Sequence, residues 1–247
     1  VELAIVLVSV HRRYERYPYF MGVYRAFFDI PSELARGITS KSLPLLLNEL
    51  LWSMGQAVLL QCYSVRGIQV VAAMNICNTV AQIFNTAFLS LGNATGIIVG
   101  QELGADRLMS ARRTAWRMMA LSFASCIVMG ALLVLCAPFI PRIYNVEHSI
   151  RTLAAELICV CAVCMPLFGI ANCSFFTIRS GGKTLMTFLF DSCFSWVVSV
   201  PAAYFLSRYS ALGIVEVYLV VSTLDVIKCI IGITLLKKGI WVKNLVK

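Results

Sequence analysis

Six long apolar runs make up most of this chain and constrain its fold more than any other feature. They lie at about 43–63, 76–100, 115–140, 153–177, 185–207 and 212–236. Each is long enough to cross a bilayer, since an α-helix needs about 20 apolar residues to do so. The composition, 60% hydrophobic and 13% charged, departs from that of soluble domains in the same direction. The sequence therefore predicts an all-α protein, a polytopic transmembrane helix bundle with six full spans.

The segments outside these runs divide the chain further. Residues 1–10 are apolar but too short to cross a membrane, and we expect them to be the end of a preceding, truncated transmembrane helix. Residues 11–42 are predicted to form a cytoplasmic linker. The six-span membrane lobe is predicted over residues 43–236, with Pro44 in the first turn of its first helix. Residues 237–247 are predicted to form a basic cytoplasmic tail.

Basic residues are divided unequally between the two sets of loops, and this predicts the orientation. One set holds 16 Lys and Arg: residues 11–42, 101–117, 178–184 and 237–247. The alternate set holds four: residues 64–75, 141–152 and 207–211. Positive charge collects on the cytoplasmic side of membrane proteins. We therefore expect a multi-pass protein of the cell (inner or plasma) membrane, with both ends of this segment cytoplasmic. The net charge of +9 then reflects topology, so the lipid bilayer is an expected partner and nucleic acid is not.

Cysteine and histidine usage argues against catalysis and metal binding. Most of the ten cysteines lie inside apolar runs, which is typical of small apolar residues in membrane helices and not of a disulfide framework. Cys159, Cys161 and Cys164 have a spacing that suggests a metal site, but as helical residues they point in different directions. With only two histidines in the chain, a Cys-His or Ser-His-Asp catalyst is not expected. The sequence therefore predicts no enzyme, no metal and no cofactor.

Four ionisable residues inside the predicted spans carry the functional signal. They are Glu49, Asp191, Asp225 and Lys228. A charge at the centre of a membrane helix costs about 2.5–3.5 kcal/mol on insertion scales, so each one requires a reason. One interpretation is a proton- or cation-responsive pathway, which we consider for Glu49 and Asp191. The other is a structural ion pair within the membrane, in which Lys228 pairs with Asp225 or with Asp191.

Uncharged polar residues form stripes along the first two predicted spans. Glu49, Gln56 and Tyr63 recur every seven residues, and Asn78, Gln82 and Asn85 share one face of the next helix. Such stripes either line a water-filled cavity or bond to neighbouring helices. We favour the cavity, because two stripes lie on adjacent spans. The predicted substrate or cation pathway comprises Glu49, Asn48, Gln56, Asn78, Gln82, Asn85 and Asp191.

Several short motifs resemble those of one family of transporters. They are residues 43–55 (LPLLLNELLWSMG), 72–74 (AAM), 92–94 (GNA), 100–105 (GQELGA), 179–184 (RSGGKT) and 241–245 (WVKNL). In this order the chain resembles the multidrug and toxic compound extrusion (MATE) transporters, which have two six-helix lobes. The resemblance implies a second lobe that lacks its N-terminal six-helix partner. It also implies an antiporter, coupled to H⁺ or Na⁺, that exports small organic and often cationic compounds by alternating access.

Two other functions follow less directly from the sequence. A lipid-linked glycan flippase of the same broad superfamily would need a larger and more basic cavity. The basic residues lie mostly in the loops, with Lys228 the sole candidate deep inside a predicted span. A membrane-embedded enzyme would need a His or Cys constellation, which the sequence does not supply. Drug or cation antiport is therefore the leading expectation.

Overall fold

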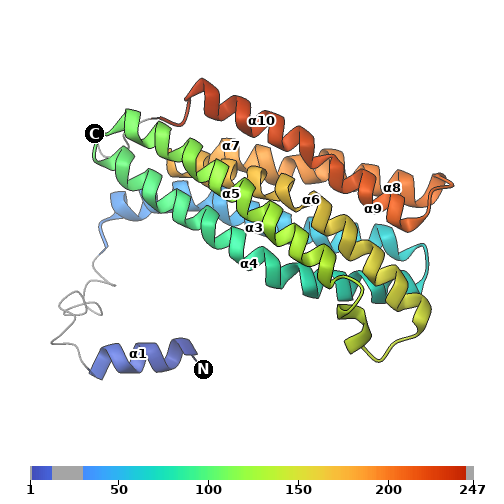
Figure 1. Ribbon diagram of the computed structural model, residues 1–247. Helices are drawn as coiled ribbons and strands as arrows, with labels where there is room; N and C mark the ends of the chain where they lie inside the picture. Colours follow the sequence, from blue (N-terminus) through green and yellow to red (C-terminus); the bar gives the residue numbers. More distant parts are fainter. Residues whose placement is uncertain (1, 13–29, 243–247) are drawn as a thin grey trace. The chain divides into compact units, whose positions relative to one another are not determined.

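The computed structural model describes residues 2–12 and 30–242 (Figure 1). The chain divides into two compact units, residues 1–43 and 44–247. The first unit contains helix α1 (Glu2–Arg12) and the beginning of α3 (Ser32–Ser64). Residues 2–12 are helical, and their place at the end of a truncated transmembrane helix stays a prediction. The helix α3 begins eleven residues before the predicted first span, so residues 32–42 of the expected linker are helical. Pro44 lies inside α3 and not in its first turn, which corrects that prediction.

The second unit is a bundle of long helices. After α3 come α4 (Ile68–Gly104), α5 (Leu108–Cys136), a short 3₁₀ turn (Ile140–Ile143) and α6 (His148–Ser180). The fifth predicted span comprises α7 (Thr184–Phe188), two π-helical segments (Leu189–Cys193 and Ser195–Ser199) and α8 (Val200–Tyr209). The sixth comprises α9 (Ile214–Thr223) and α10 (Asp225–Lys238). Within the described residues, six helical stretches are long and apolar enough to cross a membrane, and no strand occurs. The predicted all-α transmembrane bundle is confirmed.

Helix α6 is central to the second unit, where it packs against α4, α5, α9 and α10. Glycines permit the close approach of its neighbours. A side chain at Gly92 of α4 would meet the ring of Phe176, 2.6 Å from its Cβ position, and one at Gly130 of α5 would meet the carbonyl oxygen of Ala162 at 2.6 Å. Small residues at such contacts let backbones pack tightly where no hydrophobic force drives association. The bundle is therefore held in part by the fit of α6 to its neighbours.

The fifth span departs from a regular α-helix at the level of Asp191. Residues Leu189–Cys193 and Ser195–Ser199 are π-helical, and Pro201 follows in the first turn of α8. Proline has no N–H, so it cannot donate to the carbonyl of Val197 one turn earlier. π-helical turns are rare in proteins, and those that occur are often found at functional sites. The irregular backbone therefore makes this part of the bundle a candidate functional region.

Candidate functional site

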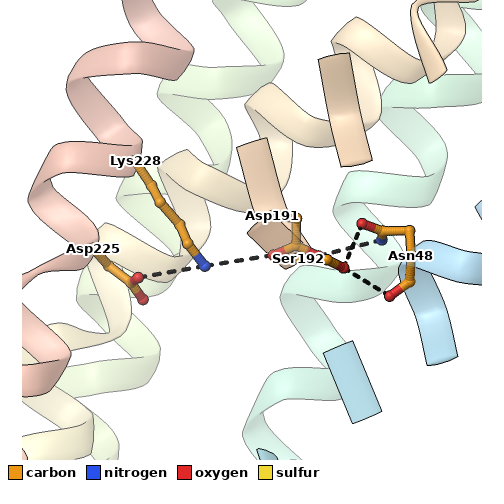
Figure 2. A network of polar contacts seen from close by, with 5 residues as sticks. All are labelled: Asn48, Asp191, Ser192, Asp225 and Lys228. Atoms are coloured by element: carbon orange, nitrogen blue, oxygen red, sulfur yellow. Dashed lines mark hydrogen bonds and ion pairs between the residues drawn. The ribbon is translucent and has the colours of Figure 1, made fainter. Parts of the chain in front are cut away.

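Three charged side chains lie together between the fifth and sixth spans (Figure 2). The Lys228 Nζ of α10 lies 3.4 Å from Asp191 Oδ1 and 3.5 Å from Asp225 Oδ1. Lys228 is 8% exposed, and both carboxylates are largely buried. Asp225 precedes Lys228 by three residues, so the two share one face of α10. The structure thus places Lys228 between the two carboxylates with which the sequence suggested it would pair.

The network continues from the fifth span to α3. The Asn48 amide donates through Nδ2 to Asp191 Oδ2 at 3.4 Å. The Ser192 hydroxyl donates to Asn48 and lies 2.8 Å from both its backbone and its side-chain oxygen. Figure 2 shows Asp191 and Ser192 facing Asn48 from consecutive positions, within the π-helical segment Leu189–Cys193. Polar contacts therefore join α3, the fifth span and α10 in one continuous chain.

The charges of this network do not cancel. Two carboxylates face one ammonium group, which leaves a formal charge of −1 when all three are ionised. The ring of Phe194 adds a cation–π contact, with Lys228 Nζ 5.2 Å from its centroid. In a low-dielectric interior such groups interact strongly, and an uncompensated charge is costly. The arrangement can therefore gain stability from one further positive charge.

A cavity of about 130 Å³ adjoins the network, and Asp225 and Lys228 form part of its wall. Other polar groups on the wall are Gln56, Tyr63, Asn78, Ser195, Ser199, Tyr218 and Ser222. The volume is below the 300–1,000 Å³ that is typical of pockets for drug-sized ligands. It is about ten times the volume that a single water molecule requires. The second unit alone thus offers room for a small ligand or part of a larger one.

The structure brings some of the residues predicted for the pathway together. Asn48, 1% exposed, and Asp191 are members of the network. Gln56 and Asn78 line the cavity. These four residues come from α3, α4 and the fifth span. Part of the first polar stripe and one residue of the second therefore meet at one cavity, whose role in transport stays a prediction.

The other predicted pathway residues lie elsewhere. The Glu49 side chain is 66% exposed, and its Oε1 lies 4.0 Å from Arg179 Nη1. Gln82 is exposed, and Asn85 is half-buried with its Oδ1 lacking a hydrogen-bond partner among the described residues. None of these three forms part of the cavity wall or of the network in the described part of the chain.

Sequence reasoning missed several residues of the site. Ser192 and Phe194 contact network members directly, and Ser195, Ser199 and Tyr218 line the cavity. Serines are common in membrane helices, where they bond to the backbone of their own helix, so they carry no signal by themselves. The one sequence feature that indicates an irregular helix near these serines is Pro201, which lacks the N–H that a regular helix would use.

Comparison with known proteins identifies the family. The MatE family model matches residues 44–205. The chain belongs to the MatE family. Members of this family are multi-pass membrane transporters and not enzymes. The resemblance inferred from the sequence motifs is confirmed.

A curated relative shows a similar likeness. The chain is 26% identical over 220 residues to a protein of Bacillus subtilis (strain 168) named probable multidrug resistance protein YoeA. The aligned region covers 86% of this chain and 46% of that relative. The chain thus spans about half the length of the curated relative it matches.

Solved structures of 16% sequence identity share the fold. A MATE in complex with MaD3S superposes with a TM-score of 0.78, covering 96% of this chain and 54% of that one. A MOP superfamily transporter from Pyrococcus furiosus gives a TM-score of 0.77 over 85% of this chain and 47% of that one. In each case the fold of this chain corresponds to about half of the known structure.

Proposed function

We propose that this chain is the C-terminal half of a cation-coupled antiporter, driven by H⁺ or Na⁺, which exports organic and often cationic compounds by alternating access. The observation that carries the proposal is the charged network of Asp191, Asp225 and Lys228, buried in a membrane lobe beside a polar cavity. Charged groups inside membrane spans mark substrate and ion pathways. The family and the name of the B. subtilis relative support the same function.

The proposal includes a partner and an orientation. We infer a six-helix N-terminal lobe as the missing partner, because the chain covers about half of its relatives. Residues 1–10 then end the last helix of that lobe, and residues 11–42 link the lobes on the cytoplasmic side. The lobe of residues 43–236 is followed by a cytoplasmic tail, residues 237–247. The excess of Lys and Arg in the corresponding loops supports this orientation.

Labelling of single cysteines introduced in intact cells tests the orientation. A membrane-impermeant maleimide should label cysteines introduced at Arg66, Arg142 or Arg208, which lie in the loops predicted to be external. A cysteine at Arg36 should react only after the cells are permeabilised. External labelling at Arg36 would overturn the orientation. The protein without an introduced cysteine, treated in the same way, gives the background labelling of the native cysteines.

Export of a fluorescent cation from cells that express the complete gene tests the function. We expect ethidium efflux that stops when the coupling gradient collapses. A protonophore removes the H⁺ gradient, and replacement of external Na⁺ by choline removes the Na⁺ gradient, so the two treatments identify the coupling ion. Efflux that survives both would contradict cation coupling. Absence of efflux together with accumulation of glycan precursors on gene deletion would favour a flippase instead.

A further inference from the structure

The lysine of the network already occupies a binding site for an ammonium group. Two carboxylates lie 3.4 and 3.5 Å from its Nζ, and the Phe194 ring faces it at 5.2 Å. Anionic oxygens and aromatic faces are the groups with which proteins recognise organic ammonium ions. The membrane lobe thus contains the chemistry for ammonium recognition, with the chain's own ammonium bound to it.

The lysine does not saturate this site. Both of its ion-pair distances exceed the 2.7–2.9 Å of a short charge-assisted hydrogen bond. Asp191 has a second donor in Asn48. For Asp225, Lys228 is the one hydrogen-bonding or ion-pair partner within the described part of the chain. Asp225 is therefore the less compensated carboxylate, and it is also the one that lines the cavity.

The cavity wall matches an alkylammonium group better than a bare metal ion. Beside Asp225 it contains the apolar side chains of Leu60, Met74 and Phe168 and the aromatic side chain of Tyr63. The polar side chains on the wall can accept the N–H groups of an ammonium, and the apolar ones can contact its alkyl chain. A hard inorganic cation would use only the oxygen ligands. Its volume of about 130 Å³ admits an amine with a short chain and not a whole drug-sized molecule.

We propose that this cavity binds the protonated amine of a transported compound, which takes the place of Lys228 at Asp225. Lys228 then pairs with Asp191 alone, and the network that held a charge of −1 becomes neutral. Its own lysine acts as a tethered competitor that occupies the site when no amine is present. This inference rests on the proposed function, since it assigns an amine-binding subsite to the exporter.

Binding of a minimal amine to the purified, complete protein tests the proposal. The probe is n-butylammonium chloride, compared with neutral n-butanol and with NaCl, and the readouts are calorimetric binding and the midpoint of thermal unfolding. We expect n-butylammonium alone to bind and to raise the midpoint. Asp225→Asn should abolish both effects. Glu216→Gln, which removes an exposed carboxylate outside the network, should retain them.

Removal of the tethered competitor gives the sharpest discrimination. Lys228→Ala should raise the affinity for n-butylammonium by about tenfold or more, the change expected when a competing charge contact is lost. If this variant does not fold, the comparison of wild type with Asp225→Asn decides. Binding by Lys228→Ala but not by wild type would overturn the proposal, because the lysine would then close the site permanently. Binding of Na⁺ instead of the amine would overturn it as well.

The outcome is separable from that of the proposed function. Ethidium export by a protein that does not bind n-butylammonium would overturn this subsite and leave the exporter standing. Failure of export under every gradient would overturn the exporter, and the subsite with it.

Discussion

Asn48 and Glu49 are neighbours in the sequence and opposites in environment. Asn48 is 1% exposed and contacts Asp191 and Ser192. The Glu49 side chain is 66% exposed, and its nearest cation is at 4.0 Å. Successive residues of a helix are separated by about 100° around its axis, so one step along α3 leads from the interior of the unit to its surface. The position of a residue along a span thus sets its depth in the membrane. Its direction around the helix axis sets whether it is buried and which residues it contacts.

This contrast separates two kinds of role for polar groups in the lobe. Changes in the buried network should alter folding, because each member leaves a partner unpaired when it is removed. Changes at the exposed carboxylate should leave folding intact and affect only what that carboxylate does for transport. Variants of the two regions therefore distinguish these two roles by their separate effects on stability and on transport.

The largest loss of stability is expected for Lys228→Ala. It leaves Asp191 and Asp225 buried with no cation between them, and removing one member of a buried ion pair costs about 3–5 kcal/mol. Membrane abundance and the thermal midpoint of the purified protein measure the loss. The triple variant Asp191→Asn, Asp225→Asn, Lys228→Met removes all three charges and should recover most of the stability. Normal stability of Lys228→Ala alone would show that water already compensates these groups.

A smaller loss is expected for Asn48→Ala. The substitution removes the donor to Asp191 and the side-chain acceptor of Ser192, whose hydroxyl keeps the backbone oxygen of residue 48. The buried Asp191 carboxylate then lacks one donor, and an unsatisfied buried polar group costs about 1–3 kcal/mol. Unfolding midpoints of the purified variant measure it. The matched control is Ser53→Ala in an exposed position of the same helix, which should change the midpoint little. Equal effects of the two variants would remove Asn48 from the network.

The spans were predictable from the sequence, as was the pairing of Lys228 with Asp225 or Asp191, but the contacts of α3 with the other spans were not. Apolar runs reveal the spans because lipid leaves the backbone few alternatives to a helix. The polar residues 32–42, in contrast, gave no sign that α3 extends through them. Asn48 and Asp191 are separated by 143 positions, and nothing in hydropathy specifies how two helices are rotated toward each other.

The seven-residue stripe illustrates the same limit within one helix. Gln56 and Tyr63 line the cavity as the stripe predicted, but Glu49 does not. An α-helix drifts by about 20° per seven residues, so residues fourteen apart no longer share a direction fully. The cavity also lies toward one end of the stripe. A seven-residue spacing therefore predicts well that residues on neighbouring turns share a face of the helix. It predicts this less well for residues at opposite ends of a span.

For Glu49→Gln we expect stability within about 0.5 kcal/mol of wild type, as for other exposed positions. Transport is expected to fall severely or to lose its dependence on external pH, since the sequence predicts this carboxylate to be part of the cation pathway. Dye efflux and membrane abundance, measured at two external pH values, check both statements. If glutamine supports wild-type efflux at normal abundance, Glu49 has no role in coupling.

The smallest effect is expected for Arg179→Gln, at the other end of the one ion pair that Glu49 forms in the described part of the chain. Both side chains are more than one-third exposed and their charged atoms are 4.0 Å apart. Such pairs contribute about 0–1 kcal/mol, so the unfolding midpoint should barely change. Efflux distinguishes two uses of the pair. If Arg179 merely lies near Glu49, Arg179→Gln should export like wild type while Glu49→Gln fails. If the two variants and their double mutant all lose export to the same degree, the ion pair itself is the functional unit. The exposed pair would then resemble the buried network, in which the charged residues also act together.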